Sequence, residues 1–371
     1  MKNTGQCFAK RLGVLPLISA LLVLAACSPA GIGEKPGSPR DALPAHITEL
    51  TELGVGVRPA WSGDGSRFLY LDALVGDVYE YDLASGSSQR LTAHFKHHGF
   101  ARAHYLANGD LLLCGPSKVD PEDPEEGRWD TDFWYLHRSL EKPAVSLGEP
   151  CFEGPAVARD SMHFAWTRTD YPEVSPLTAK SELWLGEIEL SGEQPRIVNE
   201  RKLVDRSDFY YFAMLEPQDF RGPDESELLF TAYAYRGGEV MGVDLENGQL
   251  RNYSNSWWYE EVEGVSPGGS YTTVEREFTL SLKPKGLIDI WALRLDGSGA
   301  FTRLTHFSDF NGFGANNPVI SPDCRHMLFA IRQVGGPEGN SDGLFLYDLK
   351  ASPLTPVDMC AMQEKAKLVQ E

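Results

Sequence analysis

The sequence predicts an all-β protein, a six-bladed β-propeller made of four-stranded antiparallel blades. The first observation is a tight polar turn followed by an apolar strand, which recurs at intervals of 44, 52, 64, 44 and 55 residues. The second is that each turn is followed by an alternating strand that ends in a hairpin turn, with no helical period between the units. Such repeats are typical of propellers, whereas a two-sheet sandwich would not explain six copies of one pattern. With Asp64 as the reference, the equivalent turn residues are Asn108, Asp160, Asp224, Gly268 and Asp323.

The first copy, PAWSGDGSRFLYLD (59–72), illustrates what each part of the repeat should do. Pro59 suits the start of an innermost strand, where a missing N–H costs little, and Trp61 should pack between neighbouring blades. Residues 62–65 form the turn, in which glycine and aspartate provide the backbone angles and local hydrogen bonds. Residues 68–71 should form a second strand that is apolar because adjacent blades cover both of its faces. We therefore expect the turns to be structural.

The other parts of the repeat follow each turn. The alternating strands are DVYEYDLASG (77–86), DFWYLHRSL (132–140), SELWLGEIELSG (181–192), GEVMGVDLENG (238–248), DIWALRLDGSG (289–299) and GLFLYDLKAS (343–352). Several units end in a further short strand: SQRLT (88–92), RIVNE (196–200), LRNYS (250–254) and FTRLT (301–305). These units place the propeller over residues 46–360, followed by a C-terminal tail at 361–371. We favour ring closure by a strand at 46–52, which would complete the last blade, over local closure by residues 353–359.

The first 45 residues predict a signal peptide with a lipidation site, followed by a tether. An apolar run at 12–24 follows three cations, has the length of a signal-peptide core and is too short to span a bilayer. It ends in Leu-Ala-Ala-Cys27, which resembles the lipobox of bacterial lipoproteins. The resemblance implies removal of residues 1–26, lipid on Cys27 and, because Ser28 follows, an outer-membrane location; an ordinary secretory signal is the alternative. Residues 27–45 are rich in proline and glycine, which predicts a flexible tether.

The net charge limits the classes of binding partner, and the cysteine content bears on disulfide formation and the cellular compartment. The formal net charge of −19 at pH 7 becomes −22 once residues 1–26 are removed, which disfavours nucleic acid and anionic lipid as partners. The propeller contains four cysteines, and an even number in an oxidising periplasm predicts two disulfides. Because each pair would span about one repeat, we favour Cys114 with Cys151 and Cys324 with Cys360. Buried free thiols are the alternative.

The repeat resembles that of TolB-type, WD-like propellers. The shared features are a Pro-x-Trp/Ile-Ser-x-Asp turn before an apolar strand, a YDL-x-x-Gly hairpin and an RLT strand, and they match most closely in the first, fifth and sixth units. The resemblance covers about residues 47–358 and implies the propeller fold. TolB proteins carry an N-terminal α/β domain, whereas here a tether precedes the first unit, so their role in the cell envelope does not transfer.

The loops that join an outermost strand to the next innermost strand should meet at one mouth of the central channel, where a ligand would bind. The candidate binding residues in these loops are Arg58, His94, His97, His98, Trp257, Trp258, Glu260, His306, Asn316 and Asn317. The first three histidines are also candidate ligands for a divalent metal, although their spacing matches no strong motif and surface histidines are the alternative. The two tryptophans beside Glu260 would suit a stacked sugar, with packing between blades as the alternative.

The sequence carries no intact catalytic motif. It lacks the HExxH, CxxC, P-loop and GxGxxG patterns. The GxSxG spacing occurs at 264–268 and 339–343, but with no helical pattern after it, so neither stretch forms the strand–turn–helix elbow of a serine nucleophile, and we name no catalytic residue. We therefore predict a binding or scaffold module without a required cofactor, attached to the membrane through Cys27, whose partner is an envelope protein or an oligosaccharide. The alternative is a metal-dependent carbohydrate-active enzyme that uses the histidine-rich loop, because oligogalacturonate lyases also resemble TolB-type propellers.

Overall fold

The computed structural model describes residues 31–50, 53, 58–118, 126–175, 177–191, 194–209, 213–278, 286–334 and 341–361. The predicted signal peptide and the predicted lipidation site Cys27 lie outside this part, as does the C-terminal tail beyond residue 361. The described elements are strands and four short 3-10 helices: η1 (Pro39–Ala42), η2 (Glu126–Arg128), η3 (Arg206–Asp208) and η4 (Phe307–Asp309). No helix in the described ranges has the length and apolar character needed to cross a membrane.

Four sheets are separate and contain four antiparallel strands each. The first contains β2 (Ala60–Trp61), β3 (Arg67–Leu71), β4 (Val78–Asp82) and β5 (Ser87–Arg90). The second contains β6 (Arg102–Tyr105), β7 (Leu111–Pro116), β8 (Thr131–Leu136) and β9 (Val145–Pro150). The third contains β10 (Phe152–Val157), β11 (His163–Thr169), β12 (Ser181–Ser191) and β13 (Gln194–Asp205). The fourth contains β22 (Phe313–Ile320), β23 (His326–Gln333), β24 (Leu344–Asp348) and β1 (Ile47–Leu50).

The other eight strands form one sheet, which differs from the prediction. They are β14 (Met214–Arg221), β15 (Glu227–Tyr233), β16 (Gly238–Asp244), β17 (Leu250–Asn252), β18 (Tyr259–Val265), β19 (Tyr271–Glu277), β20 (Asp289–Arg294) and β21 (Phe301–Arg303). A single parallel pairing, Gly238 with Tyr259, joins the two halves. Gly237 permits this approach, because a Cβ there would lie 2.5 Å from the carbonyl oxygen of Trp258. The prediction of six separate four-stranded sheets is therefore correct for four of them.

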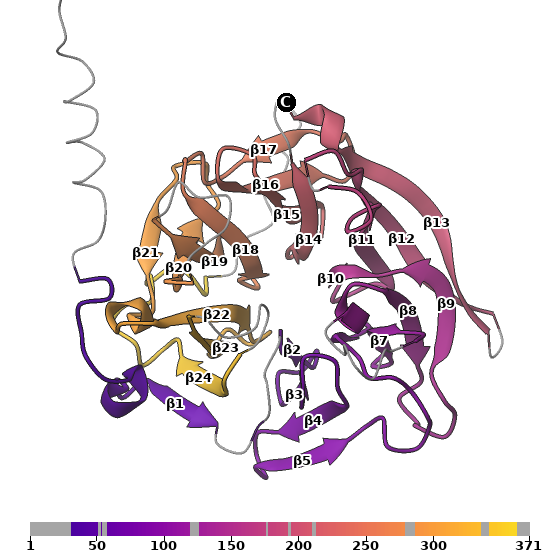
Figure 1. The fold of residues 1–371 in the computed structure, drawn as a ribbon, viewed down its shortest axis with the longest axis horizontal. Helices are drawn as coiled ribbons and strands as arrows, with labels where there is room; N and C mark the ends of the chain where they lie inside the picture. The colour runs from indigo at the N-terminus through magenta and orange to yellow at the C-terminus, as the bar shows by residue number, and fades with distance from the viewer. Residues whose placement is uncertain are drawn as a thin grey trace, which may run out of the picture.

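The sheets surround a common centre (Figure 1). The first strands of the successive four-stranded units are β2, β6, β10, β14, β18 and β22, and each contacts the next, with β22 returning to β2. Strands such as β1, β5, β9 and β13 lie on the outer rim. Side chains that are far apart in the sequence therefore meet at the centre.

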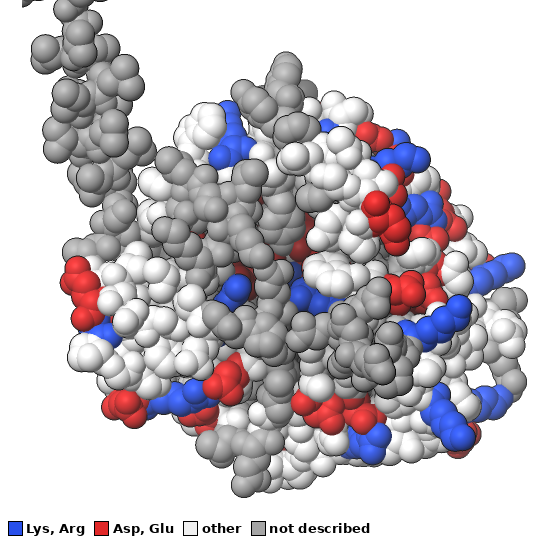
Figure 2. Space-filling view, in the orientation of Figure 1, with Lys and Arg blue, Asp and Glu red and all other residues white. Residues whose placement is uncertain are grey.

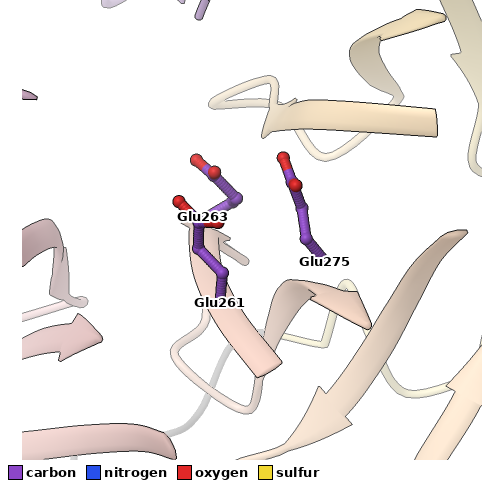
Figure 3. A group of neighbouring side chains, drawn as sticks. All are labelled: Glu261, Glu263 and Glu275. Atoms are coloured by element: carbon purple, nitrogen blue, oxygen red, sulfur yellow. The ribbon is translucent and has the colours of Figure 1, made fainter. Parts of the chain in front are cut away.

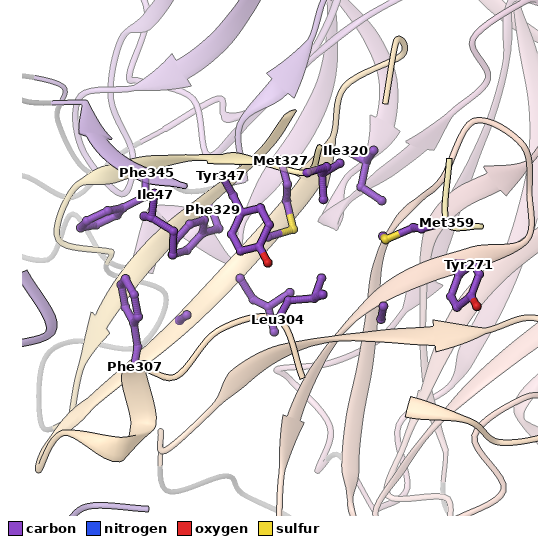
Figure 4. Packing of buried hydrophobic residues seen from close by; sticks show 14 of the residues in the cluster. Ile47, Tyr271, Leu304, Phe307, Ile320, Met327, Phe329, Phe345, Tyr347 and Met359 are labelled. Atoms are coloured by element: carbon purple, nitrogen blue, oxygen red, sulfur yellow. The ribbon is translucent and has the colours of Figure 1, made fainter. Parts of the chain in front are cut away.

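Apolar second strands fill the spaces between neighbouring sheets, as predicted. Phe68 and the three residues that follow it on β3 are buried. Trp61 ties the first sheet to the fourth, because its Nε1 donates a hydrogen bond to the carbonyl oxygen of Val319 (3.0 Å). The largest apolar cluster joins β19 and β20 to the fourth sheet (Figure 4) and includes Ile47, Tyr271, Leu304, Phe307, Ile320, Met327, Phe329, Phe345, Tyr347 and Met359.

The polar turns are held by local hydrogen bonds, which confirms their structural role. Asp64 Oδ1 accepts from the backbone N–H of Ser66 (3.0 Å) and from the hydroxyl of Ser62 (2.7 Å). In the last unit, Asp323 Oδ1 accepts from the hydroxyl of Ser321 (2.6 Å). The hydrogen bonds to Asp64, above all the one from the Ser66 backbone, lower the pKa of Asp64 to about 2.

The N-terminal strand closes the ring. β1 pairs antiparallel with β24, as favoured from the sequence, while residues 353–359 form turns and bends. The predicted tether is not free along its described part, residues 31–45. The ammonium group of Lys35 lies 3.0 Å from the carboxylate of Asp309, and Arg40 Nε lies 2.8 Å from Glu49 Oε1. Proline- and glycine-rich composition indicates irregular backbone but does not reveal such long-range contacts.

Both disulfides have the favoured pairing. Cys114 pairs with Cys151, which links β7 to the residue that precedes β10 and so joins the second and third sheets. Cys324 pairs with Cys360, which fastens the C-terminal segment to the turn between β22 and β23.

Candidate functional site

The innermost strands carry charged side chains into the centre of the ring. One of these charged residues, Arg58, precedes β2, and the remaining ones lie on strands β6, β10, β14, β18 and β19. Figure 2 shows acidic and basic side chains inside the central opening. All of them are buried or largely buried. We define the central charge cluster as Arg58, Arg102, Glu153, Glu216, Glu261, Glu263 and Glu275.

The arginines connect carboxylates from different sheets. Arg58 Nη1 forms an ion pair with Glu216, and its Nη2 lies 3.3 Å from Glu261 Oε1. Arg102 Nη2 lies 2.9 Å from Glu153 Oε2. Burial lowers the pKa of Arg102 to about 9, and the positive charge of Arg58 acts in the same direction.

Hydrogen bonds hold the remaining carboxylates in place. The hydroxyl of Tyr233 lies 2.5 Å from Glu216 Oε2 and 2.6 Å from Glu261 Oε1. The backbone N–H of Asn317 donates to Glu275 Oε1 (2.6 Å). The cluster is therefore an ordered network that spans several sheets.

Three carboxylates of this network lie closest together: Glu261, Glu263 and Glu275. Each provides an oxygen within 4.8 Å of the others, and Figure 3 shows the three side chains gathered at one place. Burial raises the pKa of Glu261 to about 8, and the charges of Glu275 and Glu216 add to this effect. Burial is also the largest cause of the raised pKa values of Glu263 and Glu275. These raised pKa values show that the surroundings disfavour the charged form of each of the three carboxylates.

A cavity of about 800 Å³ leads from the surface to the central charge cluster. Its walls are ends of innermost strands and the polar turns that follow them, so it opens on the opposite face from the loops in which we predicted the site. Its lining includes Trp61, Tyr105, Arg138, Arg159, Gln218 and Glu263. Aromatic and polar groups thus converge on one concave surface, which is the usual form of a ligand site.

Arg58, Asn316 and Asn317 are the predicted residues that the structure brings to the centre. Arg58 lies in the central charge cluster, and the backbone of Asn317 binds Glu275. The Asn317 amide Nδ2 lies 3.3 Å from the hydroxyl of Ser341, which in turn donates to Asn316 Oδ1 (3.4 Å). The two asparagines are thus buried in a network beside the carboxylates.

The three histidines of the 93–103 loop do not form a metal site in this structure. His94 Nε2 lies 3.0 Å from the carbonyl oxygen of Lys142, and His98 is exposed. Both ring nitrogens of His97 are engaged, one by Asp77 (3.1 Å) and the other by a backbone N–H. Within the described ranges, the group of potential ligands that does converge consists of glutamates. Each histidine therefore has its own partner or faces solvent, and the three imidazoles do not converge.

His306 also stands apart from the central charge cluster. Its side chain is 47% exposed, and its Nδ1 lies 3.7 Å from Asp309.

The predicted pairing of tryptophans with Glu260 does not occur. Glu260 is 0% exposed, and its carboxylate lies 2.9 Å from Arg276 Nε. Burial raises the pKa of Glu260 to about 7. Trp258 packs against Phe278 (ring centroids 5.6 Å apart), whereas Trp257 is 60% exposed. Trp257 and Glu260 therefore do not share one exposed surface in this structure.

Sequence reasoning missed most of the central carboxylates. Glu153, Glu216 and Glu275 were not candidates, although each lies on a strand near the centre. A sequence signal for these buried carboxylates was present in YEEVEGV (259–265), which places three glutamates within a strand that the repeat predicts to be innermost. Acidic residues at buried positions of an innermost strand indicate a polar centre.

Comparisons with known proteins find similar solved structures but no sequence family. No protein-family model matches the chain, and curated protein sequences yield no match. Similar solved structures include a putative TolB from Agrobacterium tumefaciens (14% identity, 69% of this chain and 77% of that chain, TM-score 0.47) and TolB from Acinetobacter baumannii (13%, 79% and 66%, TM-score 0.44). An oligogalacturonate lyase from Vibrio parahaemolyticus is also similar (11%, 84% and 94%, TM-score 0.46).

The repeats and the sheets together define an all-β protein with a propeller-type arrangement of small antiparallel sheets. Within this arrangement, the described part of the chain holds the central charge cluster beneath an open cavity.

Proposed function

We propose that this protein is a lipid-anchored, six-bladed propeller of the cell envelope that binds its partner through the central cavity. The blade count is supported by the ring of six innermost strands. Strands β14–β17 and β18–β21 are each antiparallel and four-stranded. The eight-stranded sheet therefore counts as two blades that touch at one residue pair.

The observation that carries this proposal is the cavity of about 800 Å³ at the centre of the ring. Its volume is within the range of ligand pockets. Two charge pairs lie on its wall, since Arg159 lies 3.0 Å from Asp219 and Arg67 lies 3.2 Å from Glu80. A wall that combines charges of both signs with aromatic rings suits a polar segment of low net charge. We therefore propose a segment of an envelope protein as the partner.

Site-specific photocrosslinking in intact cells tests the binding face. A photoreactive residue at Ala107, an exposed position that lines the cavity in the turn after the innermost strand β6, should form a protein adduct. The same residue at Lys202, which lies on the outer strand β13, is the control and should form none. Equal adducts at both positions, or none at Ala107 despite equal incorporation, would contradict the proposal. An adduct that carries sugar instead of protein would favour an oligosaccharide ligand.

The lipid anchor has its own test. Metabolic labelling with a fatty-acid analogue should label the full chain, and Cys27→Ser should abolish that label because the acyl chains need this thiol. Cys7→Ser is the matched control, since Cys7 lies in the predicted signal peptide and its loss should leave labelling unchanged. An unlabelled wild-type chain would show that the signal is an ordinary secretory one.

A further inference from the structure

The geometry points to a binding site for a hard divalent cation of the calcium class, formed by Glu261, Glu263 and Glu275. These side chains are 8%, 4% and 5% exposed, and their closest oxygens lie within 4.8 Å of one another. Calcium binds oxygen ligands at about 2.3–2.6 Å. Two oxygens on opposite sides of one ion are therefore at most about 5 Å apart, and this separation agrees with the group.

The strand pairing forces like charges together. Glu261 on β18 and Glu275 on β19 are direct cross-strand partners. Like charges in this position destabilise an antiparallel pair. Glu263 lies two residues further along β18, and the register shift after Val262 places it in the same group. A bound cation would turn this repulsion into attraction.

Positive charge in the protein does not balance the three carboxylates. Arg58 contacts Glu216 and Glu261 through its guanidinium, and Arg332 acts on Glu275 from beyond salt-bridge distance. Within the described part of the chain, neither Glu263 nor Glu275 forms an ion pair at salt-bridge distance. Glu275 accepts one backbone hydrogen bond, from Asn317.

Glu263 provides an independent sign of a missing partner. Its Oε1 is buried and has no hydrogen-bond partner. A buried carboxylate oxygen without a partner is costly. Glu263 also lines the central cavity, so a cation and its remaining water ligands have a path to the site.

The donor set selects the class of ion. All three side chains are carboxylates, with no imidazole or thiolate among them. Carboxylate oxygen suits calcium, magnesium and manganese, whereas zinc and copper favour nitrogen or sulfur ligands. The proposal does not depend on the cavity-binding partner, because the three side chains form the site themselves.

Titration of the mature chain with calcium chloride tests the site. After removal of metal by a chelator, isothermal titration at pH 8 should show one calcium per chain, and magnesium and manganese should compete. Glu263→Gln and Glu275→Gln should weaken binding by about tenfold or more, because loss of even an indirect metal contact typically costs that much. Glu182→Gln, which removes a carboxylate next to exposed Lys202, is the matched control and should bind as the wild type does.

Thermal unfolding separates binding from a folding defect. The two site variants should be at least as stable as the wild type without calcium, because each removes a repelling charge, and calcium should raise only the wild-type and control melting temperatures. Absence of calcium binding by the folded wild type would overturn the proposal. Equal calcium binding by the site variants and the wild type would also overturn it.

Discussion

Replacing Arg58 with leucine should lower the free energy of unfolding by about 3–5 kcal/mol at pH 8, the loss expected when one partner of a buried ion pair is removed. The Arg58 side chain is 12% exposed, and its guanidinium contacts Glu216 and Glu261. Without it, both carboxylates would remain buried beside Glu263 and Glu275 with no compensating charge from this position. Leucine replaces the aliphatic part of the side chain, so the change is mainly electrostatic.

The same variant should show a distinctive pH dependence. The folded-state pKa of Glu261 is raised to about 8 by burial and then by Glu275 and Glu216, whereas an unfolded glutamate titrates near pH 4.3. Stability from such a group is fully present below the unfolded pKa and is lost as pH rises through the folded pKa. The cost of removing Arg58 should therefore be smaller at pH 5, where the carboxylates can be protonated.

Unfolding by guanidinium chloride, with a chelator present, at pH 5 and at pH 8, measures both the loss of stability and its pH dependence. Arg196→Leu is the control, because Arg196 is 62% exposed and pairs with Glu189 at the surface. Exposed pairs contribute about 0–1 kcal/mol, so this variant should differ little from the wild type. An Arg58→Leu loss that is no larger than the control loss, or that is equal at both pH values, would show that Arg58 does not compensate the central carboxylates.

The fold was predictable because each four-stranded unit repeats a local pattern. Turn residues such as Asp64 and Asp323 make the local hydrogen bonds that the sequence indicates. The apolar strand at 68–71 is buried, as its sequence predicts. The merger of two units through Gly238 and Tyr259 was not predictable. It depends on one close backbone approach between residues from different repeats, and no periodic pattern encodes such an approach.

The site was less predictable because it depends on which residues meet across the ring. Arg58 and Asn317 were identified from their loops, and both reach the centre. The search failed where it counted residue types within one loop, since His94 and His97 are bound to separate partners. Glu275 was passed over because an acidic residue on a strand usually faces solvent. Its burial follows only from the position of that strand beside the channel.

Replacing Trp166 with alanine should also lower the free energy of unfolding by about 3–5 kcal/mol, the range for a large aromatic side chain in a packed core. Trp166 is 0% exposed and stacks on Phe164, with ring centroids 4.7 Å apart. Its Nε1 donates to Glu149 Oε1 (2.7 Å). Gly186 makes room for the ring, because a Cβ there would lie 3.0 Å from the indole. The space therefore fits a tryptophan, and we expect the alanine variant to leave a cavity there.

Trp257→Ala is the matched control, because it removes the same side chain from a position that is 60% exposed. Surface substitutions typically change stability by less than about 0.5 kcal/mol, so the two variants should differ by several kcal/mol in chemical denaturation followed by circular dichroism. Trp166→Phe should lie between them, since it keeps much of the aromatic contact but loses the bond to Glu149. Because both alanine variants delete one indole, their difference measures burial at position 166. Equal losses would contradict the packing of the second sheet against the third at this tryptophan.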